Sequence, residues 1–145
     1  MPRFTRAEDL RKHLEAAADR LQQEVIVTTQ AQLGSTDFSP YDTGRFRSSW
    51  FAAEGSPSRA VAPKEADDEN DDAKGLRIRG DQTYYLSNSL PYAQAVALGV
   101  SLPPSWGGKN RLDSKSPAWF TRFRNSNIPK IQRNAARQVK QEFDL

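Results

Sequence analysis

Cysteine is absent from this sequence of 145 residues, and histidine occurs once. The lack of cysteine excludes disulfide frameworks, thiolate metal sites and cysteine nucleophiles. A metal site or a catalytic pair built on histidine would need a second imidazole or other converging groups. We therefore expect His13 to lie beside the apolar face of a helix, with no catalytic or metal-binding part.

Long hydrophobic runs are also missing. No apolar run approaches the roughly 20 residues that a helix needs to span a bilayer. The first residues, MPRFTRAEDL, lack the apolar stretch of a signal peptide. We therefore expect a soluble protein that is made in the cytoplasm and does not contact a membrane.

Sequence signatures of catalysis are absent too. The chain has no nucleotide-binding glycine pattern, no HExxH and no GxSxG. Carboxylates are plentiful, but many of them cluster in one polar segment instead of pairing across a prospective pocket. We therefore expect this protein to act by binding and not by bond chemistry, with no enzyme activity, no cofactor and no metal.

Hydrophobic residues make up 37% of the chain, which is enough for one domain with a modest core. We expect this domain to cover residues 1–145 and to leave long loops outside the core. The net charge of +3 is small, but acidic and basic residues are separated along the chain.

The clearest local pattern is that of a long N-terminal helix. Apolar and small residues recur at steps of three and four, which predicts an amphipathic helix over about residues 6–32. Thr5 and Glu8 have the spacing of a capping box at its start, and Gly34 is typical of its end. The apolar face consists of Leu10, Leu14, Ala17, Ala18, Leu21, Val25 and Thr28.

The segment YDTGRFRSSWFAAEG comes next. Asp42 or Thr43 can cap a short helix that carries Phe46 and Trp50 on one side, and a strand begins near Trp50. Two cations point away from that side, toward either an oligomer interface or an anionic partner. They are Arg45 and Arg47.

Residues 62–75 are strongly acidic. They offer few apolar atoms to bury, so we expect a solvated, flexible loop at the tip between two strands, with an acidic surface that could meet a basic neighbour. A calcium loop is matched only in part, because Asp72 takes the position of the turn glycine and Ile78 that of the bidentate glutamate. The carboxylates are those of Glu65, Asp67, Asp68, Glu69, Asp71 and Asp72.

The stretches KGLRIRG and QTYYLS follow, and their alternation predicts a hairpin around Gly80 and Asp81. After them, Asn88 or Ser89 can cap a helix that is entered at Pro91. Small residues give this helix a face that can approach a neighbouring backbone or subunit closely. That face consists of Tyr92, Ala95, Val96 and Gly99.

Residues 100–116 are rich in proline, glycine and polar residues, which predicts an extended loop. Trp106 is the one large aromatic residue in it. A tryptophan in such a loop either binds a partner or packs back on its own domain. We treat Trp106 as a candidate partner-binding residue.

The C-terminal third predicts two helical segments. Ser116 and Pro117 can start the first, which carries an aromatic cluster at 119–123, and the stretch NSNIP interrupts it. The second runs on from Pro129 with apolar residues on one side. Its opposite side is either a solvated face, a surface for nucleic-acid phosphates or a surface for an acidic neighbouring subunit. That side carries Lys130, Arg133, Arg137 and Lys140.

Two of these segments together carry a resemblance. YDTGRFRSSW followed by NSLPYAQAVALG resembles the paired signature of the tailed-bacteriophage neck and tail-completion family, to which lambda minor tail protein Z is similar. This chain departs from the family pattern at Ala97, where the family usually carries glutamate. The matching positions are Thr43, Gly44, Phe46, Ser49, Trp50, Asn88, Pro91, Tyr92, Ala93 and Gly99.

The resemblance covers residues 5–140 in the order of their elements. It implies an α+β fold in which long N-terminal and C-terminal helices flank a small antiparallel sheet, with long loops. It also implies a structural virion protein that forms a ring of six or twelve copies at the head-to-tail junction, joins the connector to the tail and lets DNA pass through its lumen. The partners implied are further copies, portal-side connector proteins, the tail terminator or tail tube protein, and genomic DNA bound without sequence specificity.

The two family segments are where we expect subunits to associate. Arg133 and Arg137 are the candidates for a role facing the DNA lumen or another subunit. The alternatives are a tail terminator ring that caps the tail tube, and a free nucleic-acid-binding protein without sequence preference. The expected subunit interface consists of Thr43, Gly44, Arg45, Phe46, Arg47, Trp50, Tyr92, Ala95 and Val96.

Overall fold

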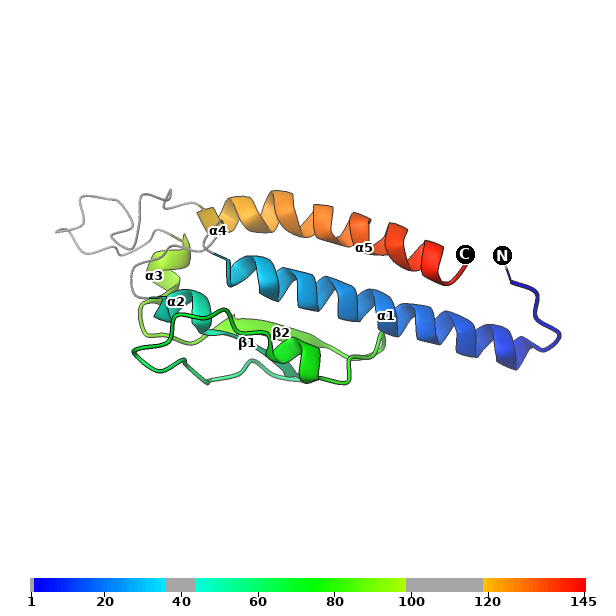
Figure 1. Ribbon diagram of the computed structural model, residues 1–145, viewed down its shortest axis with the longest axis horizontal. Helices are drawn as coiled ribbons and strands as arrows, with labels where there is room; N and C mark the ends of the chain where they lie inside the picture. The colour runs from blue at the N-terminus through cyan, green and yellow to red at the C-terminus, as the bar shows by residue number, and fades with distance from the viewer. Residues whose placement is uncertain (1, 36–43, 99–118) are drawn as a thin grey trace.

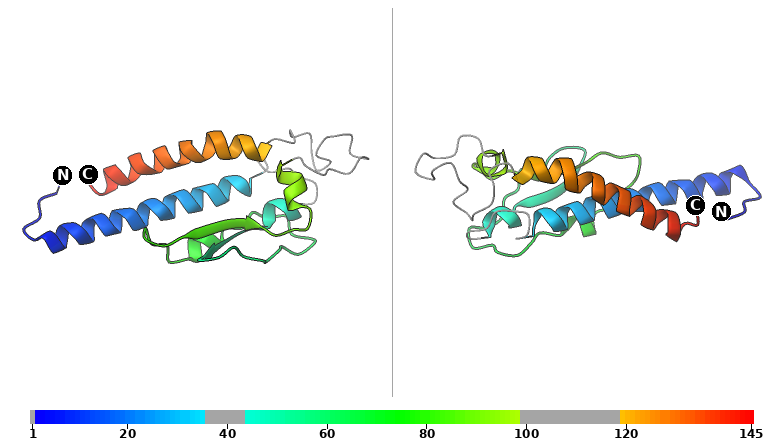
Figure 2. Two further views of the ribbon diagram at one scale, coloured as in Figure 1. Left: turned by 180° about the vertical axis from the view of Figure 1, so that it is seen from behind. Right: turned by 90° about the horizontal axis from the view of Figure 1, so that it is seen from above.

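The computed structural model describes residues 2–35, 44–98 and 119–145. Two long helices lie one above the other, and a small sheet lies on the far side of the first of them (Figures 1 and 2). The first is α1 (Ala7–Leu33), and the second is α5 (Ile128–Glu142). α1 is therefore the middle layer, with α5 on one side and the sheet on the other.

The sheet has two antiparallel strands, β1 (Trp50–Glu54) and β2 (Tyr84–Asn88). Trp50 pairs with Asn88 at one end of the ladder and Glu54 pairs with Tyr84 at the other. The prediction of an α+β fold, with a small antiparallel sheet and two long terminal helices, is confirmed. Both helices lie on the same side of the sheet.

Short helical elements fill the remaining positions. α2 (Arg45–Ser48) leads into β1, and the 3-10 turn η1 (Asp72–Gly75) lies within the long connection between the strands. α3 (Ala93–Leu98) follows β2. α4 (Trp119–Arg122) and the π-helical turn η3 (Phe123–Asn127) lead without a break into α5.

Two clusters of buried side chains form the core. The larger one joins α2, β1, α3, α4 and both long helices, and the smaller one joins α1, β1 and η1. The larger consists of Leu33, Phe46, Trp50, Leu90, Ala93, Val96, Ala97, Trp119, Phe123 and Ile131. The smaller consists of Ile26, Ala52, Ala73 and Ile78.

The predicted hairpin at Gly80 and Asp81 is wrong, because the residues before it do not form a strand. Ile78 is buried in the smaller core cluster, and the Gly80 N–H donates to Oδ1 of Asp19 on α1 at 2.8 Å. A methyl group on Gly80 would lie 2.7 Å from Cβ of Ala18, so the chain passes very close to α1 here. Contact with a helix replaces strand pairing in this stretch.

Three predicted details of the helix ends also differ. α1 begins after Arg6 without a side-chain cap, and Glu8 accepts hydrogen bonds from Arg11 instead of closing a capping box. α3 begins at Ala93, two residues after Pro91, and neither Asn88 nor Ser89 caps it. Asn88 Oδ1 instead accepts from the Leu90 N–H at 3.3 Å, and the Ser89 hydroxyl donates to the Ser58 carbonyl at 2.7 Å.

The stretch NSNIP does not interrupt the C-terminal helix. Pro129 lies in the first turn of α5, where its missing N–H cannot complete the regular hydrogen-bond ladder. The preceding residues widen into the π-helical turn η3, and the helix continues. The predicted cap at Asp42 or Thr43, the helix start at Ser116 and Pro117, and the loop at 100–116 lie outside the described residues.

Candidate functional site

The two segments that carry the family resemblance meet in space. Asn88 pairs with Trp50 across the sheet, and its Nδ2 donates to the Phe46 carbonyl at 2.8 Å. The Phe46 ring lies edge-on to Trp50, with ring centres 5.8 Å apart. Ala93 and Val96 of α3 belong to the same core cluster. Residues about 40 positions apart in the chain therefore form one packed unit.

This packing corrects part of the predicted subunit interface. Phe46, Trp50 and Val96 are buried within the chain itself, with exposed fractions of 3%, 5% and 0%. Gly44 is buried as well. Phe46, Trp50 and Val96 belong to the larger core cluster and expose almost no surface to another subunit. Ala97, at the position where the family carries glutamate, is also buried in this cluster.

Tyr92 is exposed, at 37%. Thr43 and Trp106 lie outside the described residues, as does the side chain of Ala95. Of the predicted face, Tyr92 is thus exposed and Val96 is buried, while Gly99 lies outside the described residues as well.

Arg45 has a partner inside the chain. Its Nε donates to the Ala62 carbonyl at 2.9 Å. The Ser49 hydroxyl accepts from the Ala62 N–H at 3.0 Å and donates to the Arg45 carbonyl at 2.7 Å. Arg45 and Ser49 thus bind both backbone groups of Ala62, which fixes the start of the acidic segment.

Arg47 binds the middle of the same segment. Its Nη1 donates to the Gly34 carbonyl at 3.0 Å, while Nη2 donates to the Asp67 carbonyl and pairs with the Asp67 carboxylate at 3.4 Å. The Ser48 hydroxyl donates to the Asp68 carbonyl. Both guanidinium groups therefore bind the chain's own backbone, and the expectation that Arg45 and Arg47 also face a partner stays a prediction.

Gln30 anchors the end of the acidic segment. This side chain of α1 is 1% exposed. Its Nε2 donates to the Trp50 carbonyl at 3.0 Å and to Oδ1 of Asp72, and its Oε1 accepts from the Ala73 N–H at 3.0 Å. Oδ1 of Asp72 also accepts from the Ala52 N–H at 3.1 Å. One buried amide therefore joins α1, β1 and η1.

Gln30 carries a weak signal in the sequence, and Asp72 carries none. Gln30 lies four residues after Ile26 and three before Leu33, so a polar side chain occupies the apolar stripe of α1. Such a residue is usually satisfied by a buried partner. The sequence does not distinguish Asp72 from the other acidic residues around it, so its buried hydrogen bonds cannot be predicted.

Replacing Gln30 with leucine is expected to destabilise the fold. The change removes the hydrogen bonds that Gln30 makes with the Trp50 carbonyl, the Ala73 N–H and Asp72, at a total cost of about 2–4 kcal/mol. Urea unfolding followed by circular dichroism measures this cost. Gln23→Leu, on a half-buried part of the same helix, is the matched control. Equal stability of the two variants would contradict the anchoring role of Gln30.

The outer face of α5 is basic, as the sequence predicts. Ile131, Ala135 and Val139 are buried against the rest of the molecule. Residues on the opposite side of the helix are exposed, and none forms a salt bridge with another residue that the structure describes. They are Lys130, Arg133, Arg137 and Lys140.

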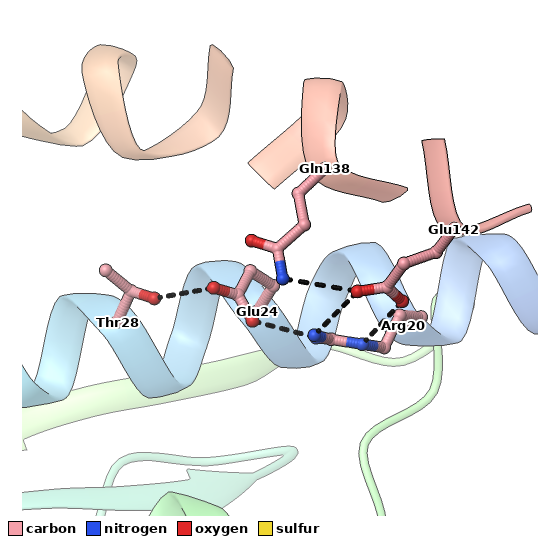
Figure 3. A network of polar contacts seen from close by, with 5 residues as sticks. All are labelled: Arg20, Glu24, Thr28, Gln138 and Glu142. Carbon is pink, nitrogen blue, oxygen red and sulfur yellow. Dashed lines mark hydrogen bonds and ion pairs between the residues drawn. The ribbon is translucent and has the colours of Figure 1, made fainter. Parts of the chain in front are cut away.

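A polar network between α1 and α5 holds the acidic side chain of α5 away from this face (Figure 3). Glu142, the acidic residue of α5, turns toward α1 and pairs with Arg20 at 3.2 Å. Arg20 also donates to Glu24 at 2.8 Å, and Gln138 donates to Glu142 at 3.2 Å. The bond with Glu24 raises the pKa of Arg20, burial opposes this, and the charge of Glu142 adds to the rise. Arg20 therefore stays charged.

A cleft of about 180 Å³ lies beside this network between α1 and α5. Its lining is rich in amide side chains, and its carboxylate, that of Glu24, is already bound to Arg20 and to the Thr28 hydroxyl at 3.3 Å. Within the residues that the structure describes, no group of three or more histidine, cysteine or acidic residues could hold a metal ion. In the same residues, no helix has the length and apolarity to cross a bilayer.

Comparison of the chain with protein-family models, with curated proteins and with solved structures found no match. Three features of the described residues bear on function. They are the packed unit of the two resemblance segments, the acidic segment that this unit binds, and the basic face of α5.

Proposed function

We propose that this protein is a structural subunit of a tailed-phage virion, which forms a ring at the head-to-tail junction. The ring joins the connector to the tail and lets DNA pass through its lumen. The observation that carries the proposal is the meeting of the two resemblance segments, in which Asn88 binds the Phe46 carbonyl beside Trp50. Two short sequence matches that arose by chance would have no reason to lie in contact in the fold. Their contact here therefore supports the resemblance.

The surface chemistry agrees with a protein that works by contact. The described residues present a basic helix face and an acidic segment held in a fixed shape by Arg47 and Gln30. Surfaces of this kind bind partners and give specificity through charge.

The test is the stoichiometry of the chain in purified phage particles, measured by quantitative mass spectrometry. A fixed number near six or twelve copies per particle is expected for a closed ring. Absence from the particle would overturn the proposal. Cross-linking of the particle would then separate a neck ring, next to portal-side proteins, from a tail terminator, next to the tube protein.

The basic face of α5 favours a second candidate, a free nucleic-acid-binding protein. Four cations on one helix face can contact successive phosphates without reading sequence. Such binding would weaken steeply with salt, with a slope of log K against log salt of about −0.9 for each phosphate contacted. Binding of the purified chain to duplex DNA at several salt concentrations, together with its absence from particles, would support this candidate.

A further inference from the structure

We propose that the basic face of α5 in one copy docks on the acidic segment of the next copy, so that the ring closes through a head-to-tail contact. The basic face consists of Lys130, Arg133, Arg137 and Lys140, and the acidic segment is residues 62–75. This inference rests on the ring of the proposed function and names the surfaces that build it.

Within the part of the chain that the structure describes, no acidic residue forms a salt bridge with the basic face. Glu142 is committed to Arg20 in the layer below, and Glu24 is bound there too. The four cations therefore repel one another without compensation from the described residues of the same molecule. An acidic surface on a second molecule would relieve that repulsion.

The acidic segment has the opposite excess. Glu65, Asp68 and Glu69 are exposed, and the described residues give none of them a salt bridge. The two lysines of the segment do not balance it, and Lys74 is paired with Asp71 at 3.5 Å. The excess negative charge faces outward.

The acidic segment is presented in a fixed shape, which lowers the entropic cost of docking. Arg45 and Ser49 hold Ala62, Arg47 holds Asp67, and Gln30 holds Asp72 and Ala73, as described above. The segment thus differs from a flexible acidic tail, which would lose much of its binding energy in becoming ordered.

The two surfaces lie on opposite sides of the molecule. η1, at the end of the acidic segment, lies on the sheet side of α1, and α5 lies on the other side (Figures 1 and 2). One copy therefore cannot bring its own basic face onto its own acidic segment. Two different surfaces that fit each other make a heterologous contact, and repetition of that contact gives a ring when the rotation closes.

Because the chain has no cysteine, a cross-linking test needs no background substitutions. Arg137→Cys and Glu69→Cys variants are mixed and treated with a short bismaleimide. We expect a cross-linked pair between the two variants and none within either variant alone. The double variant is expected to give a ladder of higher oligomers. Glu54→Cys, at an exposed position at the end of β1, replaces Glu69→Cys as the matched control.

A charge-reversal pair tests the same contact without cross-linking. Arg133→Glu with Arg137→Glu is expected to weaken self-association at least about tenfold at low salt, because like charges then face each other. Mixing this variant with one that carries Glu65→Lys and Glu69→Lys is expected to restore association between the two. Arg3→Glu with Lys12→Glu, which changes the net charge equally at exposed positions of the N-terminal region, is expected to leave association unchanged.

These experiments can show that the proposed contact is wrong without ruling out the ring. Cross-links between two copies of Arg137→Cys, or no more cross-linking than the Glu54→Cys control, would overturn the contact. In the particle, Arg137→Cys is labelled with a photoreactive maleimide, since DNA has no thiol for a bismaleimide. Its photocross-linking to genomic DNA would overturn the contact as well, because the face would then line the lumen. A fixed copy number in the particle leaves the ring standing in each of these cases, whereas absence from the particle removes the ring itself.

Discussion

Replacing Gly44 with alanine is expected to destabilise the protein by about 2–5 kcal/mol, through backbone strain and overpacking together. Gly44 has φ of +90°, a conformation that residues with a Cβ rarely adopt. A Cβ at this position would lie 2.2 Å from Oδ1 and 2.6 Å from Cα of Asp67. The second of these atoms is backbone, so a change of rotamer cannot relieve the clash.

Gly55→Ala is the matched control for Gly44→Ala. Gly55 has φ of +80°, but a Cβ there would meet no atom within 4 Å. Its cost should therefore be strain alone, about 1–2 kcal/mol. Urea unfolding of both variants measures the difference. If the two variants lost equal stability, the close approach of Asp67 to Gly44 would not contribute.

Trp119→Ala is the second large effect, with an expected loss of about 3–5 kcal/mol. The indole is 7% exposed, lies edge-on to Phe46 with ring centres 6.0 Å apart, and packs against Phe120. Its Nε1 donates to the Val96 carbonyl at 2.9 Å. The variant thus leaves a cavity and removes the indole's bond to α3.

Trp119→Phe separates the two contributions. It keeps most of the aromatic packing and removes the indole N–H, so we expect a loss of about 1–2 kcal/mol. Tyr85→Ala, at an exposed aromatic position of β2, should stay within about 0.5 kcal/mol of the unmodified chain. Thermal unfolding followed by near-ultraviolet circular dichroism reports both changes. A loss for Trp119→Ala no greater than that for Tyr85→Ala would mean that the aromatic cluster is not a stabilising core.

The long helices can be predicted from the sequence because their signal is local. α1 and the basic face of α5 follow from the spacing of apolar and charged residues within a few turns. The end of α1 at Gly34 is predictable for the same reason, since the helix pattern stops there.

The errors arise where distant residues decide the structure. Phe46 and Trp50 are predicted at a subunit interface, because nothing near them in sequence shows that Trp119 and Phe120 cover them. The stretch around Ile78 alternates between apolar and polar residues like a strand. In the structure it packs against α1 and does not pair with another strand. Alternation reports which side chains are buried, and it does not say whether a strand or a helix buries them.

The acidic segment shows the same limit for polar residues. Its charge predicts a solvated loop, and the exposure of Glu65 and Glu69 agrees with that. Its anchoring cannot be foreseen, because Arg45, Arg47 and Ser48 bind main-chain carbonyls. Every residue carries such a carbonyl, so side-chain patterns do not reveal which of them will be bound.

That mode of anchoring has a consequence for how the surface can change. The rest of the chain binds the acidic segment mainly through backbone atoms, those of Ala62, Asp67, Asp68 and Ala73. Among the side chains of the segment, it binds mainly that of Asp72. Side chains such as Glu65 and Glu69 can therefore be exchanged while the loop keeps its shape. A lineage of such proteins could retune which neighbour it accepts by altering charge alone, without rebuilding the scaffold that presents it.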